Sequence, residues 1–149
     1  HAAAGTNETV LQLESSNDPN AVLIYSNNVG IYFQLKDSSR NGRTWHKDYN
    51  QIDVADTDMQ HYVWTYDNAV GYPQLYVNAI SQSGVISTDN GFSNYDNPAI
   101  LKIHVAGNSQ NETDELRGKL SQLSIWKGSL PSTAVTKIYM KCRKSEPIG

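Results

Sequence analysis

This 149-residue sequence is poor in cysteine, in charge and in long apolar runs. The single cysteine, Cys142, excludes an internal disulfide framework. Charged residues make up 18% and the net charge is −3, so the basic surface typical of nucleic-acid binding is missing. No apolar run approaches about 18 residues, so we expect no membrane insertion. The length fits one domain, residues 1–149, and is too short for a complete α/β barrel.

Asparagine, serine and aromatic residues are abundant by contrast. The chain has 14 Asn, 15 Ser, nine Tyr and three Trp. Asn and Ser favour turns, whereas Tyr and Trp favour strands and binding surfaces. Hydrophobic residues make up 38%, which is enough for a core. The composition therefore predicts many short strands joined by polar loops.

Alternation of apolar and polar residues marks the strands. In residues 30–36 (GIYFQLK), the odd-numbered apolar side chains should share one face and the even-numbered polar ones the other. Residues 27–30 (NNVG) should form a hairpin turn, because Asn and Gly accept positive φ. The expected strands are 10–13, 21–26, 30–36, 43–46, 51–54, 61–66, 74–78, 85–87, 100–105 and 120–126.

One helix is expected, over residues 131–141. Val135, Ile138, Tyr139 and Cys142 fall at spacings that form a single apolar stripe, and Pro131 suits a first helical turn. Many strands followed by one late helix predict an all-β, antiparallel two-sheet sandwich.

Two segments resemble laminin-G-like and pentraxin-like domains. Residues 61–67 (HYVWTYD) followed by 75–78 (LYVN) are similar to the family's central hairpin. Residues 118–127 (GKLSQLSIWK) followed by Leu130-Pro131-Ser132 resemble its closing strand and helix. The resemblance covers about residues 60–140 well and implies a concanavalin A-like jelly roll. It also implies that Trp64 and Trp126 belong to the core.

The sequence departs from the family at several positions. Gln60 stands where the family usually has Trp, and Ala79 where it has Gly. The opening strands are short or missing, which would leave an unpaired sheet edge. Either the early segment supplies the opening strand, or a neighbouring subunit lends one.

Domains of this kind mostly bind sugars, glycoproteins, receptors or each other, but related folds include endoglycanases. Those enzymes need two carboxylates on one strand, as E-x-D-x-E or E-x-D-x-x-E. The nearest string, Glu112-Thr113-Asp114-Glu115, lacks the final Glu and lies in a polar loop. Cys142 lies on the helix stripe, where a buried inert thiol is the default. We therefore predict no enzymatic activity.

Calcium is the metal that the resemblance raises, since some family members hold it at the loop rim. Asp89, Asn90 and Asp96 in the loop over residues 88–98 are the candidate ligands, because Ca²⁺ is held by carboxylate and amide oxygens. The same residue types also crowd ordinary turns, so turn formation is the alternative. No other cofactor is expected.

A sugar site combines an aromatic plane with amide and carboxylate groups. The candidates are Trp45, Tyr49, Asn94, Tyr95 and Asp96, with Tyr95 between Asn94 and Asp96 as the best-placed cluster. Trp45 can equally serve as a core residue. We expect a lectin-like recognition domain that binds a glycan or glycoprotein through its rim loops. The alternative is a self-assembling subunit of a surface layer, fibre or virion.

Two Asn-x-Thr sequons, at Asn7 and Asn111, are candidate glycosylation sites. The sequence starts with His1 rather than Met and has no signal peptide. The sequons and the missing Met together favour a secreted protein or one on a cell or virion surface. In a chain this rich in Asn, chance sequons are the alternative.

Overall fold

The computed structural model describes residues 7–52, 60–83, 85–96, 98–107, 116 and 120–144. Contacts within the chain define two compact units. Unit 1 combines residues 1–51 with 86–120, and unit 2 combines residues 52–85 with 121–149. Each unit is organised around its own antiparallel sheet.

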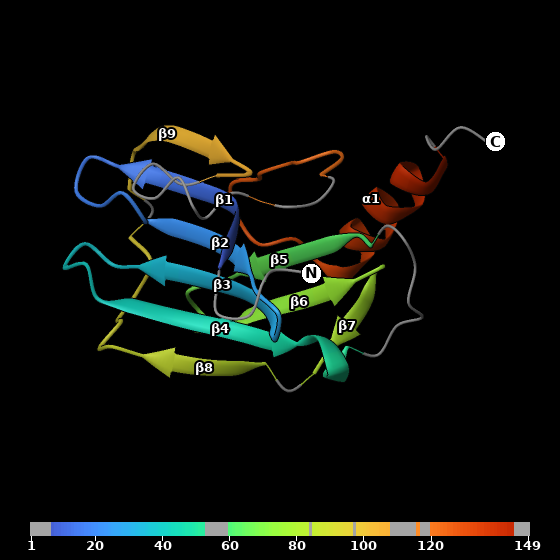
Figure 1. Ribbon diagram of the computed structural model, residues 1–149, viewed down its shortest axis with the longest axis horizontal. Coiled ribbons are helices and arrows are strands. Elements are labelled where there is room, and N and C mark those ends of the chain that lie inside the picture. The colour runs from blue at the N-terminus through green and yellow to red at the C-terminus, as the bar shows by residue number, and fades with distance from the viewer. Residues whose placement is uncertain are drawn as a thin grey trace. The chain divides into compact units, whose positions relative to one another are not determined.

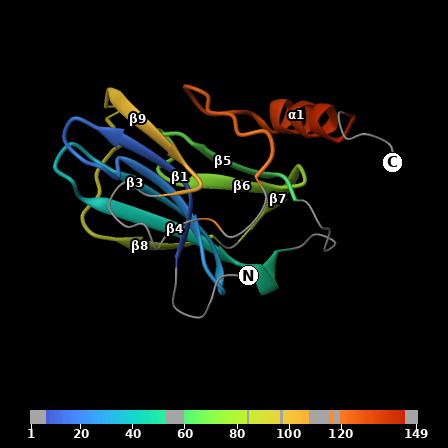
Figure 2. The same cartoon turned by 45° about the horizontal axis from the view of Figure 1, so that its top comes forward.

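Unit 1 contains a six-stranded sheet in the order β8-β4-β3-β2-β1-β9. All neighbouring pairs are antiparallel. Both views show β9 beside β1 at one side of the sheet and β8 beside β4 at the other (Figure 1 and Figure 2). The strands are β1 (Glu8–Ser15), β2 (Val22–Ser26), β3 (Gly30–Lys36), β4 (Gly42–Asp48), β8 (Ile86–Asp89) and β9 (Ile100–Val105), and the 3-10 helix η1 (Tyr49–Gln51) follows β4.

Alternation along β3 separates a buried face from a polar one, as the sequence predicts. Ile31, Phe33 and Leu35 are buried, whereas the even-numbered side chains between them are half-buried. Trp45 lies opposite Phe33 on β4, with ring centroids 6.0 Å apart. These aromatic and aliphatic side chains form the core of unit 1.

The predicted hairpin turn over residues 27–30 joins β2 to β3, but none of its four residues has the expected positive φ. The Asn27 side-chain carbonyl accepts the N–H groups of Val29 (2.8 Å) and Gly30 (3.2 Å). Gly30 is required by packing, because a Cβ there would lie 2.3 Å from the backbone oxygen of Lys47. The turn thus depends on a close approach of β3 to β4.

Unit 2 contains the three-stranded sheet β5-β6-β7, with β5 (Tyr62–Tyr66), β6 (Pro73–Val77) and β7 (Ile80–Gln82). The predicted hairpin of β5 and β6 is confirmed. A two-residue turn joins β6 to β7, and both of its residues are left-handed, Asn78 at φ 52° and Ala79 at φ 65°. Positive φ at both central residues matches the type I′ hairpin turn.

The predicted C-terminal helix is also confirmed, as α1 (Ser132–Lys144). The Pro131 carbonyl accepts the N–H groups of Ala134 and Val135, so the first turn starts as expected. Val135 is fully buried, and the ring of Tyr139 lies 5.8 Å from the ring of His61. Among the described helices, none has the length and apolarity needed to cross a bilayer.

The expected strand over residues 120–126 is wrong, because the structure assigns no strand there. Gln122 is left-handed at φ 56°, which interrupts an extended backbone and its alternation. The assignment of Trp126 to the core is wrong too, since its side chain is 45% exposed. The expected strand at 51–54 is replaced at its start by η1, and residues 53–59 lie outside the described part.

The fold class is therefore two antiparallel sheets with one C-terminal helix, as expected for a chain rich in short strands. The first strand, β1, is longer than the predicted 10–13 and lies between β2 and β9. The early segment thus supplies a strand of its own. In the described part of the chain, the sheet ends at β8 and β9.

Candidate functional site

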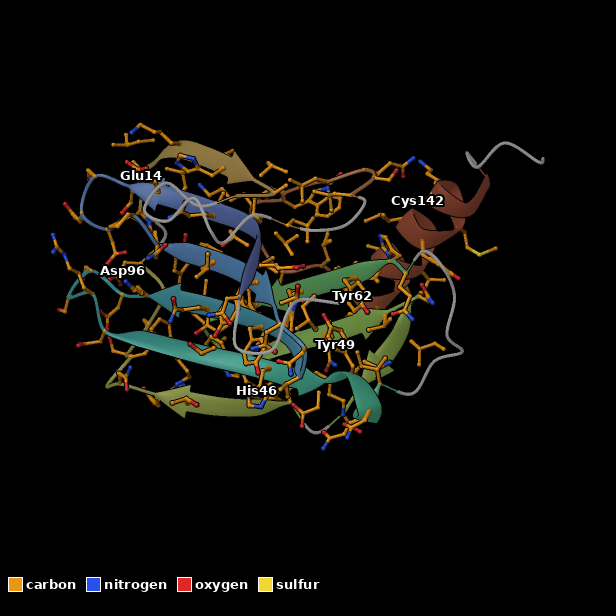
Figure 3. All side chains as sticks on the ribbon, viewed as in Figure 1. Glu14, His46, Tyr49, Tyr62, Asp96 and Cys142 are labelled. Carbon is orange, nitrogen blue, oxygen red and sulfur yellow. The ribbon has the colours of Figure 1, made fainter. Side chains whose placement is uncertain are left out.

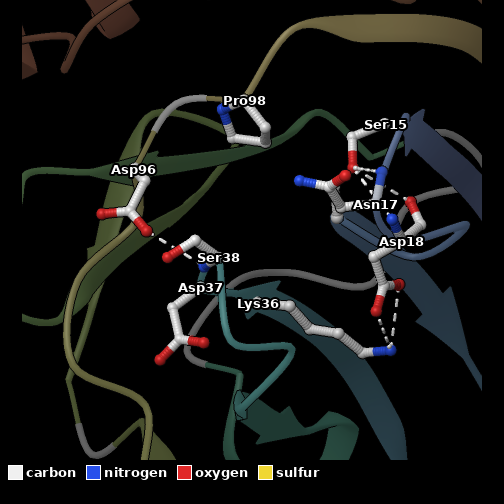
Figure 4. A pocket seen from close by; sticks show the side chains of 9 residues that line it. Ser15, Asn17, Asp18, Lys36, Asp37, Ser38, Asp96 and Pro98 are labelled. Atoms are coloured by element: carbon white, nitrogen blue, oxygen red, sulfur yellow. Dashed lines mark hydrogen bonds and ion pairs between the residues drawn. The ribbon is translucent and has the colours of Figure 1, made fainter.

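Three loops of unit 1 meet at one end of the six-stranded sheet: the β1–β2 loop, the β3–β4 turn and the β8–β9 loop. They line a small, solvent-open pocket with a cavity volume of about 40 Å³, which we call the rim pocket (Figure 4). That space is smaller than the roughly 300–1,000 Å³ of typical small-molecule sites. Its lining residues are Ser15, Asn17, Asp18, Ala21, Lys36, Asp37, Ser38, Asp96 and Pro98.

Asp37 fixes two of these loops to each other. Its Oδ1 accepts the N–H groups of Ser39 and Asn41 at 2.9 Å, which shapes the β3–β4 turn. Its Oδ2 accepts the N–H and the hydroxyl of Ser93 in the β8–β9 loop. Burial acts to raise the pKa of Asp37, but these hydrogen bonds outweigh it and hold the pKa below its ordinary value.

Asp18 and Lys36 form the charged wall of the pocket. Asp18 is 6% exposed, and its two oxygens accept from the Lys36 ammonium at 3.0 and 3.1 Å. The N–H of Asn20 also donates to Asp18, at 2.6 Å. Polar atoms of the β1–β2 loop are therefore held in place by the fold. This preorganisation suits a binding site, because little order remains to be imposed by a ligand.

The β8–β9 loop is anchored in the core by Phe92, which is 5% exposed. Its ring meets the Trp45 ring edge-on, with centroids 6.0 Å apart. The Arg43 guanidinium lies over both rings and pairs with the Asp89 carboxylate. The hydrogen bond from Arg43 lowers the pKa of Asp89 below its ordinary value. The loop that carries Tyr95 and Asp96 thus starts from a rigid base.

The candidate sugar-site residues fall in three places. Trp45 is 2% exposed and belongs to the core of unit 1. Tyr49 follows β4 at the end of the sheet away from the rim pocket, and Figure 3 shows it well apart from Asp96. Burial raises the pKa of Tyr49. Asn94, Tyr95 and Asp96 stay together in the β8–β9 loop. The rim cluster is therefore the part of the predicted site that the fold brings to a pocket.

Within the rim cluster, Asp96 lines the pocket and its Oδ2 accepts the N–H of Ser38 at 2.9 Å. Tyr95 is half-buried, and burial raises the pKa of its phenol. Asn94 is exposed. A carboxylate, a phenol and an amide thus occur in sequence at the rim. These groups can serve the hydroxyls of a sugar.

The predicted calcium ligands are not gathered into one set. Asp89 is occupied by Arg43 and by the N–H of Phe92, whereas Asp96 accepts from Ser38. Asn90 is exposed and donates its N–H to the Gly42 carbonyl. Among the described residues, no group of three or more His, Cys, Asp or Glu side chains is arranged to hold a metal ion. These three residues do not fit a calcium site as they stand.

A stacked row of rings on the polar face of the sheet was missed from the sequence. The Tyr25 and Tyr32 rings stack with centroids 4.6 Å apart, and Tyr32 and His46 stack at 5.0 Å. We call these three residues the aromatic row. The signal was present in the alternation, which places Tyr32 and His46 on the polar face. What the sequence does not give is the register that sets these residues opposite one another.

The aromatic row is linked to the rim pocket along β3. Tyr32, Gln34 and Lys36 point to the same face, and Lys36 also lines the pocket. At about 3.3 Å per residue, Tyr32 lies roughly 13 Å from Lys36. Gln34 between them hydrogen-bonds the Thr44 hydroxyl at 3.0 Å. The polar face therefore continues the pocket as a track of hydrogen-bonding groups.

The remaining candidates are not among the described residues that line the rim pocket. Asn7 is exposed and accepts a hydrogen bond from the Asn27 amide, while Asn111 lies outside the described residues. The acidic string 112–115 lies outside them as well. Cys142 is half-buried on α1 in unit 2.

No protein-family model matches the chain, and no curated protein sequence matches it significantly.

Proposed function

We propose that this chain is a non-catalytic recognition module that binds neutral saccharides at the rim pocket. The observation that carries the proposal is the exposed Asp96 carboxylate on a rim whose loops are held in place. Asp18 and Asp37 are buried and accept hydrogen bonds from the fold, so they fix the loops. The Oδ2 atom of Asp96 accepts from Ser38, and because the carboxylate is exposed, a sugar hydroxyl can donate to it at little ordering cost.

The charge of the pocket narrows the ligand class. Three aspartates and one lysine line it, so its formal charge is −2. A sulfated or sialylated glycan would bring like charge to these carboxylates and be repelled. A neutral sugar, or one carrying an amine, is the better match.

The ligand of this proposal is a chain rather than a single sugar. The track from Lys36 through Gln34 to Tyr32 offers hydrogen bonds beyond the pocket. Because the rings of the aromatic row lie face to face, they present edges and polar atoms rather than open ring faces. The row is therefore suited to hydroxyl contacts more than to stacking.

The fold we infer with this function is the jelly-roll sandwich of laminin-G-like domains. It is supported by the antiparallel hairpins and by the late helix that follows an apolar segment. We place the protein outside the cell or on a cell or virion surface, where glycans and glycoproteins are found. Exposure of Asn7 suits glycosylation of its sequon, and a Asn7→Gln change should remove any glycan there.

Glycan-array binding followed by calorimetry tests the proposal. Asp96→Ala should lower the affinity of a bound neutral glycan at least about tenfold, which corresponds to about 1.4 kcal/mol. Asp67→Ala is the matched control, because Asp67 is also exposed and also accepts one backbone N–H, that of Ala69. The control should bind as the wild type does. Failure to bind any glycan, with or without added Ca²⁺, would contradict the proposal.

A length series of the bound glycan tests the track along β3. Affinity should rise with chain length, and Tyr32→Phe should weaken long ligands while leaving the shortest unchanged. Tyr76→Phe in unit 2 is the control. Equal affinity for short and long ligands would restrict the site to the rim pocket. Release of reducing ends during binding would show that the module is an enzyme instead.

A further inference from the structure

β9 forms one side of the six-stranded sheet, and it exposes apolar side chains. In the described part of the chain, β9 pairs with β1 and no strand pairs with its other side. Leu101, Ile103 and Val105 are 62%, 56% and 47% exposed. An edge strand with free backbone groups and apolar side chains is open to addition of another strand.

The backbone N–H and C=O groups of β9 that face the open edge belong to residues that also carry exposed apolar side chains. Ala106, just after the strand, donates its N–H to the Val10 carbonyl of β1 at 3.0 Å. Backbone groups of successive residues in an antiparallel strand point alternately to the two sides. From Lys102 to Val105 the even-numbered residues of β9 therefore point to β1. Ile103 and Val105, which lie opposite Leu13 and Leu11 on the core face, direct their N–H and C=O groups to the open edge, whereas Leu101 lies at an irregularity of the β1–β9 pairing.

The opposite side of the sheet is built differently. β8 has four residues, and Ser87 and Thr88 are exposed. Asp89 at its end is paired with Arg43. A short, polar edge with a charge resists strand addition. The two edges therefore do not match each other, which disfavours head-to-tail growth into a fibre and favours a closed pair.

We propose that two copies of this chain pair through β9, antiparallel about a two-fold axis at Ile103. In this register Ile103 lies opposite Ile103 of the second copy, and Leu101 lies opposite Val105. The apolar side chains of both copies then lie on the same face of the joined sheet. This is because residues opposite each other in a sheet share a face, and both members of each of these pairs are odd-numbered. The two six-stranded sheets become one continuous sheet with the apolar side chains of both copies together.

The charges on the other face tolerate this register. Lys102 lies opposite His104 of the second copy. Within each copy, Glu14 already accepts from Lys102 and contacts His104, both at 3.2 Å. The two Lys102 side chains are thus balanced by two Glu14 carboxylates. Like-charge repulsion between the two Lys102 side chains, which lie diagonally across the seam, is therefore reduced.

The competing occupant is the chain's own segment over residues 120–126. Its apolar side chains, Leu120, Leu123, Ile125 and Trp126, are also exposed. The Leu116 N–H donates to the Ala106 carbonyl at 3.3 Å, which places Leu116 beside the end of β9. If this segment covered β9, the protein would be a monomer at every concentration.

Sedimentation velocity over a dilution series tests the pairing. The wild type should be a concentration-dependent dimer, and Ile103→Lys should raise its dissociation constant at least about tenfold. Ser87→Lys on the other edge is the matched control and should stay dimeric. Should Ile103→Lys fail to fold, Ile103→Thr keeps a β-branched side chain and should weaken the dimer in the same direction. A strictly monomeric wild type, or a dimer unchanged by both Ile103 variants, would overturn the proposal.

Hydrogen exchange on the wild-type protein supplies an independent readout. The amides of Ile103 and Val105 should exchange slowly at high concentration and fast on dilution. Those of Lys102 and His104 should be slow throughout, because they point to β1. Protection of the odd-numbered amides that does not depend on concentration would assign the edge to the chain's own segment and overturn the pairing.

Discussion

Asp37 and Ser93 lie 56 residues apart in the sequence, and one oxygen of Asp37 accepts both the N–H and the hydroxyl of Ser93, at 3.2 and 3.3 Å. The other oxygen closes the β3–β4 turn. One carboxylate therefore holds together two of the three loops that form the rim pocket.

Replacing Asp37 should weaken both the fold and the pocket. In Asp37→Asn an amide nitrogen replaces one carboxylate oxygen. Because this nitrogen cannot accept from the N–H and O–H donors around it, hydrogen bonds are lost at a buried position. We expect the free energy of unfolding to fall by about 2 kcal/mol. Urea unfolding followed by circular dichroism measures this. Asp67→Asn, at an exposed turn, should stay within about 0.5 kcal/mol of the wild type.

Acid should destabilise the protein through its paired carboxylates. The pKa values of Asp37, Asp89 and Glu14 lie below their ordinary values in the folded chain. Their stabilising contribution is complete above the pKa of the unfolded state and is lost as the pH falls through the lower, folded-state pKa. The urea midpoint should therefore drop below about pH 4. Asp37→Asn should flatten that slope, and an unchanged slope would contradict the assignment.

Gly30 should resist substitution because of packing. A Cβ there would lie 2.3 Å from the Lys47 backbone oxygen, which cannot move without disturbing the β3–β4 ladder. We expect Gly30→Ala to cost at least about 2 kcal/mol of unfolding free energy. Gly107→Ala is the control, since a Cβ at Gly107 meets nothing within 4 Å. Equal costs for the two variants would show that space at Gly30 is not the cause.

Ala79 is a position where glycine should improve the protein. Its φ of 65° is left-handed, a conformation that costs an L-residue roughly 1–2 kcal/mol and costs glycine little. Ala79→Gly should raise the unfolding free energy, by about 1 kcal/mol or less because the unfolded chain gains freedom. Ala134→Gly, inside α1, should lower it. A loss at Ala79 would mean that the turn does not carry this strain in solution.

Strands in which apolar and polar residues alternate strictly, or which a recognisable turn connects, can be predicted from the sequence. The strand β3 and the β5–β6 hairpin are examples. Residues 120–126 show where this fails. Apolar and polar residues alternate over part of this segment, but the left-handed Gln122 breaks the extended backbone. The local sequence contains no pattern from which that conformation could be predicted. The resemblance to laminin-G-like domains places Trp126 in the core, but its side chain is exposed. Alternation indicates a face, but a face becomes buried only if something covers it.

The candidate site was predictable only in its local part. Asn94, Tyr95 and Asp96 are adjacent, so the sequence could group them. Asp18 and Lys36 are 18 residues apart and meet only because β2 and β3 return the chain to the same end of the sheet. The aromatic row likewise depends on strand register, which one sequence seldom fixes.

The packing of Arg43 over Trp45 has a practical consequence. Arg43 also pairs with Asp89, from which the loop bearing Asp96 begins. The indole therefore lies next to a cation whose position depends on the rim. Indole emission responds to a nearby charge, so a ligand that shifts this loop should alter the fluorescence of the wild-type chain. The fluorescence of Trp45 can therefore report ligand binding at the rim pocket, although Trp45 does not line that pocket.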